Sequence, residues 1–151
     1  MSRLSAALER AAGWLRPQRD AVLGEWVRAV ADVRGVAEAG VREACARELD
    51  ALFERFAAGD VDGLLAEESR RAEREARRGG SLLAAAVDIR VLDRCLAAVL
   101  ATACPDRETL ADTLVALDEL GDRRLEAFLA AQEDESSRRL VEAQEQAARG
   151  A

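Results

Sequence analysis

Residues 82–103 read LLAAAVDIRVLDRCLAAVLATA. Its apolar residues occur on nearly every side of a helix with 3.6 residues per turn, a pattern typical of a helix surrounded by other elements. Gly79 and Gly80 break the chain just before it, and Ser81 is a suitable N-cap. The sequence therefore predicts a central buried helix over residues 82–103, around which the other helices pack.

One acidic residue, Asp88, interrupts an apolar face of this helix. At 100° per residue, that face also contains Ala85, Leu92, Cys95, Leu96 and Val99. A buried carboxylate has to be ion-paired, hydrogen-bonded or protonated, because an isolated buried charge is too costly. Two interpretations stay open: Asp88 pairs with an arginine from a neighbouring helix, or it lines a pocket for a ligand or signal.

Two further residues are candidates for such a pocket beside Asp88. Trp26 belongs to an early amphipathic helix and either packs in the core or offers a flat surface on which a ligand stacks. Arg90 falls on the side of the helix opposite to Asp88. The candidate pocket residues are therefore Trp26, Asp88 and Arg90.

The segments before residue 82 also have helical period, and none alternates like a strand. Pro17 ends the first helix, and Gly35 and Gly59 end the second and third. The predicted helices cover residues 4–15, 18–33, 36–58 and 60–78. In the last of these, glutamates interleave with arginines, which is typical of a solvated helix and argues against the alternative of a nucleic-acid patch.

The chain ends in a helix that outruns its own apolar side. This helix begins near Arg107, and its apolar side stops near Leu129. Residues 132–139 have nothing to bury by this pattern, so we predict a helical domain over 1–131 and a polar helical extension over 132–151. We call this last helix the output helix, because it is our candidate for passing on a signal or forming a dimer. Its candidate contact residues are Leu125, Phe128, Leu129, Leu140 and Val141. Their heptad pattern is weak, so an intrinsic coiled coil is not established.

Composition excludes several classes of protein. The net charge of −7 opposes binding to nucleic acid or to an anionic membrane surface, and no apolar stretch reaches the roughly 20 residues that span a bilayer. The chain has no histidine, which removes nucleophile–histidine pairs, zincin motifs and ferritin-like di-iron sites. The three cysteines form no C-x-x-C pair. We therefore expect a cytoplasmic protein that is not an enzyme and has no catalytic residues, metal or cofactor.

Three stretches resemble a known family. They are Glu25-Trp26, the charged helix ending in RRGGSL at residues 77–82, and VDIRVLDRCL at residues 87–96. Together they resemble the N-terminal sensor domain of the RsbR-type co-antagonist proteins of bacterial stressosomes. The same pattern also occurs ahead of some bacterial histidine kinases. The resemblance implies a globin-like fold without haem, a homodimer, and a long C-terminal helix that leads to an effector. The absence of histidine agrees with a globin-like fold that binds no haem through a proximal imidazole.

The fold expected from these observations is an all-α, globin-like bundle of about six helices with a long C-terminal helix. The first functional hypothesis is a non-haem sensory or regulatory domain that signals through a dimer and its last helix to an effector or a stressosome-type partner. A ligand-independent helical protein-binding module is the second hypothesis. A small-molecule-binding bundle is the third. A closed core would favour protein binding, whereas a pocket of a few hundred Å³ with convergent polar groups would favour ligand sensing.

Overall fold

The computed structural model describes residues 2–80 and 82–150, and within them the chain is helical with no strand. This confirms the predicted all-α class and the long last helix. The elements in chain order are α1 (Arg3–Leu15), η1 (Arg16–Gln18), α2 (Arg19–Arg34), η2 (Glu38–Gly40), α3 (Arg42–Ala58), α4 (Val61–Arg77), α5 (Leu82–Ala103) and α6 (Arg107–Gly150). No helix in the described ranges is long and apolar enough to cross a membrane.

Glycines end α2 and α3 as the sequence predicts. Gly35 and Gly59 adopt left-handed φ values of 66° and 62°, which a glycine reaches without steric cost. The start of α3 was predicted too early, at residue 36 rather than at Arg42. Ala37 is extended and only a short 3-10 turn follows it, so regular helical hydrogen bonding begins later. The predicted N-cap of α5, Ser81, lies outside the described residues.

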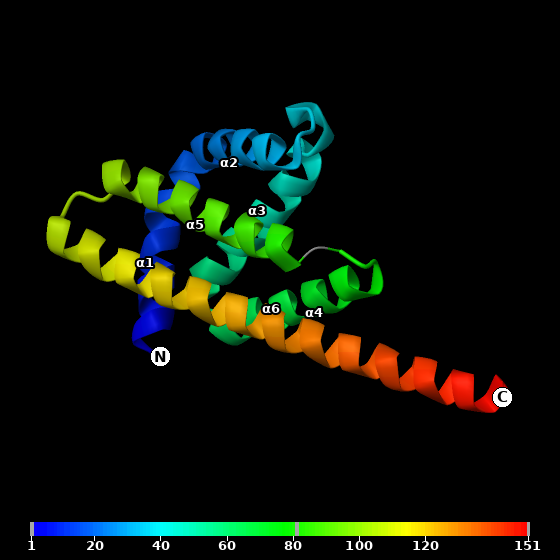
Figure 1. Cartoon of the computed structure of the whole chain (residues 1–151). Helices are drawn as coiled ribbons and strands as arrows, with labels where there is room; N and C mark the ends of the chain where they lie inside the picture. Colours follow the sequence, from blue (N-terminus) through cyan, green and yellow to red (C-terminus); the bar gives the residue numbers. More distant parts are fainter. Residues whose placement is uncertain (1, 81, 151) are drawn as a thin grey trace.

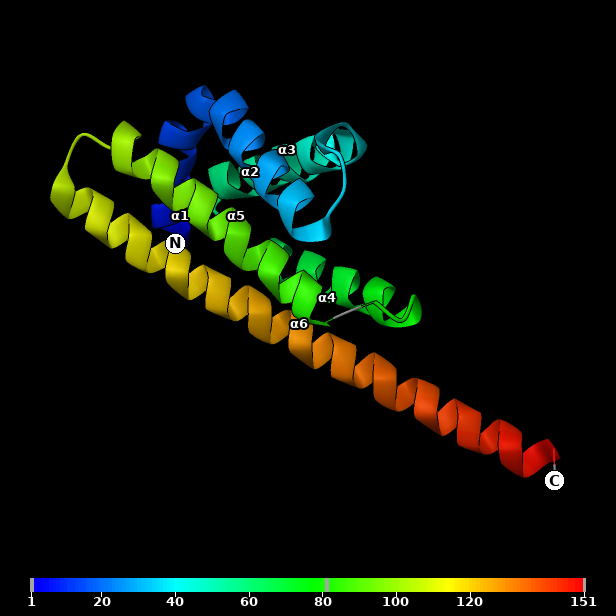
Figure 2. The ribbon, with the colours of Figure 1, turned by 45° about the horizontal axis from the view of Figure 1, so that its top comes forward.

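The helix α5 lies against α1 and α2 on one side and runs antiparallel to the first half of α6 (Figures 1 and 2). Its core side presents Ile89, Leu92, Leu96 and Leu100, all of which are buried. The opposite side of α5, including Arg94 and Ala98, is exposed. The prediction of burial on all sides is therefore wrong, because much of the apolar character of α5 comes from alanine, which surfaces tolerate well.

The helix α6 forms one side of the body and then leaves it as an arm (Figures 1 and 2). It has 44 residues and is therefore about 66 Å long at 1.5 Å per residue. The helix α4 packs along α6 and extends the contact between the body and α6 towards the arm. All described residues from Ser136 onward are exposed.

Contacts between the body and α6 continue beyond Leu129, where the apolar side of this helix was predicted to end. Glu135 is buried, with Arg77 Nε at 3.3 Å and Arg138 Nη1 at 2.9 Å from its two carboxylate oxygens. Arg139 Nη1 donates a hydrogen bond of 2.6 Å to the carbonyl oxygen of Ala76 at the end of α4. The expectation that residues 132–139 bury nothing is therefore wrong, because polar contacts replace apolar ones there.

Candidate ligand site

A cavity of about 210 Å³ lies where α2, α3, α4, α5 and α6 meet. Its apolar wall is formed by Trp26, Ala51, Leu52, Leu64, Ile89 and Leu92. Its charged wall contains four carboxylates, Glu48, Glu67, Glu68 and Asp88, and three guanidinium groups, Arg55, Arg71 and Arg124. At about 30 Å³ per water molecule in the liquid, the cavity has the volume of about seven waters.

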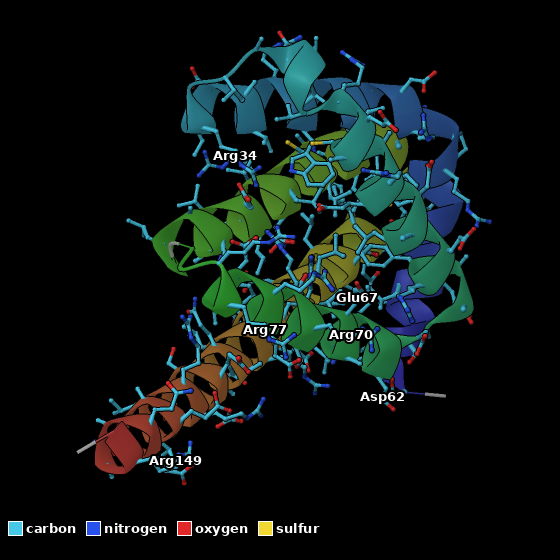
Figure 3. The ribbon with its side chains drawn as sticks, turned by 90° about the vertical axis from the view of Figure 1, so that its right-hand side faces the viewer. Arg34, Asp62, Glu67, Arg70, Arg77 and Arg149 are labelled. Atoms are coloured by element: carbon cyan, nitrogen blue, oxygen red, sulfur yellow. The ribbon has the colours of Figure 1, made fainter. Side chains whose placement is uncertain are left out.

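Asp88, the acidic residue inside the apolar face of α5, has arginine partners from two other helices. Arg34 Nη2 at the end of α2 donates a hydrogen bond to Asp88 Oδ2, and Figure 3 shows Arg34 at that end of the body. Arg71 Nη2 on α4 lies 3.4 Å from the same oxygen. The prediction of an arginine pair is confirmed, and Asp88 lies on the cavity wall as well.

A second buried ion pair, between Glu68 on α4 and Arg124 on α6, joins these two helices at the cavity wall. Arg124 Nε and Nη2 lie 3.1 and 2.6 Å from Glu68 Oε1, and both side chains are about 95% buried. The other oxygen, Oε2, has Arg71 Nη1 at 3.7 Å, which is too far for a hydrogen bond. The pair therefore links the cavity directly to the long helix.

The sequence analysis missed Glu68, because α4 as a whole has the composition of a solvated helix. A narrower signal was present. Leu64, Glu68, Ala72 and Ala76 follow one another at intervals of four residues and are the buried residues of α4. A stripe of one leucine and two alanines in a charged helix indicates a narrow packed face, so a glutamate within that stripe is a candidate buried residue.

Glu48 differs from the other cavity carboxylates because it has no ion-pair partner within 4.0 Å among the residues that the structure describes. Glu48 is an exposed residue that lines the cavity, and desolvation by the neighbouring groups still raises the pKa of its carboxyl. This desolvation outweighs the field of Arg71, the largest influence that lowers the pKa of Glu48.

Two buried polar atoms on the cavity-lining residues lack a hydrogen-bond partner within the described part of the chain. They are Trp26 Nε1, a donor, and Glu68 Oε2, an acceptor. Buried polar groups in folded proteins are nearly always hydrogen-bonded, so these two unpaired atoms are exceptions that need an explanation. Both atoms belong to residues that also have large buried surfaces, which places them in a water-poor environment.

The structure brings together Trp26 and Asp88, two of the three predicted pocket residues, and places Arg90 elsewhere. Arg90 Nη2 lies 2.6 Å from Asp122 Oδ1 on α6, on the outer side of the contact between α5 and α6. Its assignment to the pocket is therefore corrected. The reason is the helical angle, since Arg90 lies on the side of α5 that faces away from Asp88.

The predicted contacts of the output helix also divide into two groups. Phe128 is fully buried against Ala72 and Ala85, and Arg71 Cζ lies 6.0 Å from its ring centroid. Phe128 is therefore corrected from a surface contact to an internal one. Leu125 is half-buried, whereas Leu129, Leu140 and Val141 are exposed on α6.

No group of three or more potential metal ligands occurs in the described residues. Comparison with known proteins found no matching family model, no similar curated protein and no similar solved structure.

Proposed function

We propose that this chain is a sensory domain that binds a small ligand in the cavity and relays its presence through α6. The position of Arg124 is the observation that carries the proposal. This residue belongs to the long helix, lines the cavity and forms the buried pair with Glu68. A group that contacts Glu68 or Arg124 therefore acts on α6 without an intervening element.

The relay that we propose is a small shift of α6 against α4. A ligand changes a conformational equilibrium only if it binds one arrangement better than the other. Competition for Glu68 would weaken its hold on Arg124, and Phe128 lies one turn further along α6, in contact with Ala72 of α4. Small helix shifts of this kind are a common form of signal transmission.

The output side of the proposal is the free arm. Leu140 and Val141 are exposed on it, Leu129 is exposed on the part of α6 beside the body, and these residues offer apolar contacts to a second copy of the chain or to an effector. This agrees with the resemblance to RsbR-type sensor domains, from which we propose the homodimer, the stressosome-type partner and the globin-like character; a cytoplasmic location is proposed from composition. A ligand-independent protein-binding module is the competing function, and it needs no cavity.

The test combines binding and helix dynamics. The full chain is screened against a library of small metabolites by thermal shift, with Ala51→Trp as the control because residue 51 lines the cavity and a large side chain there narrows it. We expect at least one compound to raise the melting temperature of the parent chain but not of the variant. Hydrogen exchange of the amides around Arg124 should then change when the compound is bound.

Two results would count against this function. If no compound binds, ligand sensing is wrong and the protein-binding module is favoured. If a compound binds in the cavity while hydrogen exchange along α6 is unchanged, the relay is wrong even though the cavity is a binding site.

A further inference from the structure

We infer that the ligand of this cavity is a small organic cation that carries a hydrogen-bond acceptor, such as a primary amine or guanidine with a hydroxyl oxygen. The inference rests on the proposed function and adds the chemical class of the ligand. Three features of the cavity support it: the carboxylate of Glu48 without an ion-pair partner, the free acceptor of Glu68 and the free donor of Trp26.

The charged groups of the cavity wall are not all paired. Each arginine of the wall is already engaged by a carboxylate: Arg55 Nη1 lies 2.8 Å from Asp60, Arg71 contacts Asp88, and Arg124 contacts Glu68. Glu48 has no such partner in the described part of the chain, whereas two arginines contact Asp88. Glu48 is therefore the wall carboxylate with which a ligand cation could pair, and it would repel an anionic ligand at close range.

The hydrogen-bonding capacity points in the same direction. Glu68 Oε2 is buried and accepts no hydrogen bond from a described residue, and a carboxylate oxygen in this position accepts most strongly from a charged N–H donor. An ammonium group has three donors and a guanidinium group has five, so either could contact both Glu48 and Glu68. A ligand without donors would leave Glu68 Oε2 without a hydrogen bond.

Trp26 is the reason why the ligand should carry a hydrogen-bond acceptor. Its Nε1–H is a donor only, it is buried, and it has no hydrogen-bond partner in the described ranges. An oxygen of the ligand would satisfy this group, while the indole ring itself attracts cations. The apolar side chains of Leu52, Leu64 and Leu92 suit a short aliphatic link between the cation and the oxygen. The volume of about 210 Å³ limits the ligand to a small molecule.

The test uses a matched series of probes of similar size: 3-amino-1-propanol, 1-propylamine, 1,3-propanediol and 3-hydroxypropanoate, all at the same ionic strength. Binding to the full chain is followed through the indole N–H resonance of Trp26, which the Trp14→Phe variant assigns. We expect 3-amino-1-propanol to bind most tightly and 1-propylamine more weakly, because it lacks the acceptor. The diol and the anion should leave the Trp26 resonance unchanged.

Two variants on α3 test the role of the carboxylate. Glu48→Gln should weaken the binding of 3-amino-1-propanol at least about tenfold, as expected for loss of a charge-assisted contact. Glu54→Gln, the matched control, removes an exposed carboxylate that does not line the cavity and should leave the affinity within about twofold. The variant spectra also show that both proteins are folded.

The inference is overturned if the anion or the diol binds as tightly as the amino alcohol, if Glu48→Gln binds as tightly as the parent chain, or if no probe moves the Trp26 resonance at millimolar concentration. These results leave the proposed sensing function standing, because the library screen and the hydrogen exchange of α6 test that function separately. If neither the library compounds nor the probes bind, both the inference and the proposed function are overturned.

Discussion

Arg124 on α6 directs two hydrogen bonds, from Nε and Nη2, to one carboxylate oxygen of Glu68 on α4. The two residues are separated by 56 positions in the chain, and both are buried. Their geometry joins the helix that leaves the body to the helix that packs beside it. The contact is therefore both a structural link and the proposed point at which a ligand acts on α6.

Removal of one member of this pair should destabilise the fold strongly. Arg124→Met leaves the Glu68 carboxylate without its main partner, and loss of one partner of a buried pair costs about 3–5 kcal/mol. The double variant Glu68→Leu, Arg124→Met should recover most of that loss, because apolar groups of similar volume replace buried pairs at little cost. Urea denaturation of the single and double variants measures both effects.

An exposed ion pair on the same helix provides the control. Arg123 Nη2 lies 2.8 Å from Glu119, and both side chains are half exposed. Arg123→Met should therefore change the free energy of unfolding by no more than about 1 kcal/mol. If Arg124→Met is equally mild, or if the double variant is no more stable than the single one, the pair is not the link described above.

The stability of the fold should respond to pH through Asp93. Burial raises the pKa of this carboxyl to about 6, against the fields of Arg124 and Arg90, and its Oδ2 is buried without a hydrogen-bond partner among the described residues. Because the folded-state pKa exceeds the unfolded value, the contribution of Asp93 to stability is complete below about pH 3.8 and is lost as pH rises through about 6.

The variant Asp93→Asn removes this titration. The free energy of unfolding of the parent chain should therefore fall relative to that of Asp93→Asn by about 1 kcal/mol between about pH 5 and pH 7.5. Denaturation of both proteins at each pH isolates the effect, since the other carboxylates are common to both. A constant difference between the two proteins across this range would show that Asp93 does not titrate there.

The arm should divide into a part that the body needs and a part that it does not. Truncation after Ala143 removes no described residue that is buried and leaves one turn beyond Arg139, so the free energy of unfolding should change by less than about 0.5 kcal/mol. Truncation after Leu129 also removes Glu135 and the hydrogen bond from Arg139 to Ala76 and should cost about 2 kcal/mol or more. Equal stability of the two truncated chains would mean that the polar contacts after Leu129 contribute nothing.

Substitutions on α6 should separate packing from association. Phe128→Ala should lower the free energy of unfolding by about 3–5 kcal/mol, because Phe128 is fully buried. The double variant Leu140→Arg, Val141→Arg changes exposed residues and should leave stability nearly unchanged, but it should weaken a dimer that uses the arm. Urea denaturation and sedimentation velocity distinguish the two outcomes. Loss of a dimer in Phe128→Ala at unchanged stability would contradict the internal role of Phe128.

Local sequence patterns predicted the helices and several of their ends, although not the start of α3 at Arg42. Pro17, Gly35 and Gly59 act through local backbone preferences, and the apolar periods of α1, α2 and α3 depend on residues only a few positions apart. Asp88 was recognisable as a buried carboxylate for the same reason. Local sequence patterns also predicted α6 as one helix, although they did not show where its contacts with the body end.

The pairing of the charges and the position of the cavity depend on how the helices pack against one another. The chain has 29 acidic residues and 22 arginines, so local spacing allows many pairings that a periodic pattern does not distinguish. The pairing of Glu68 with Arg124 depends on how α4 packs against α6. The cavity is formed by five helices together, so its volume and the position of the unpaired Glu48 on its wall arise from packing between distant segments.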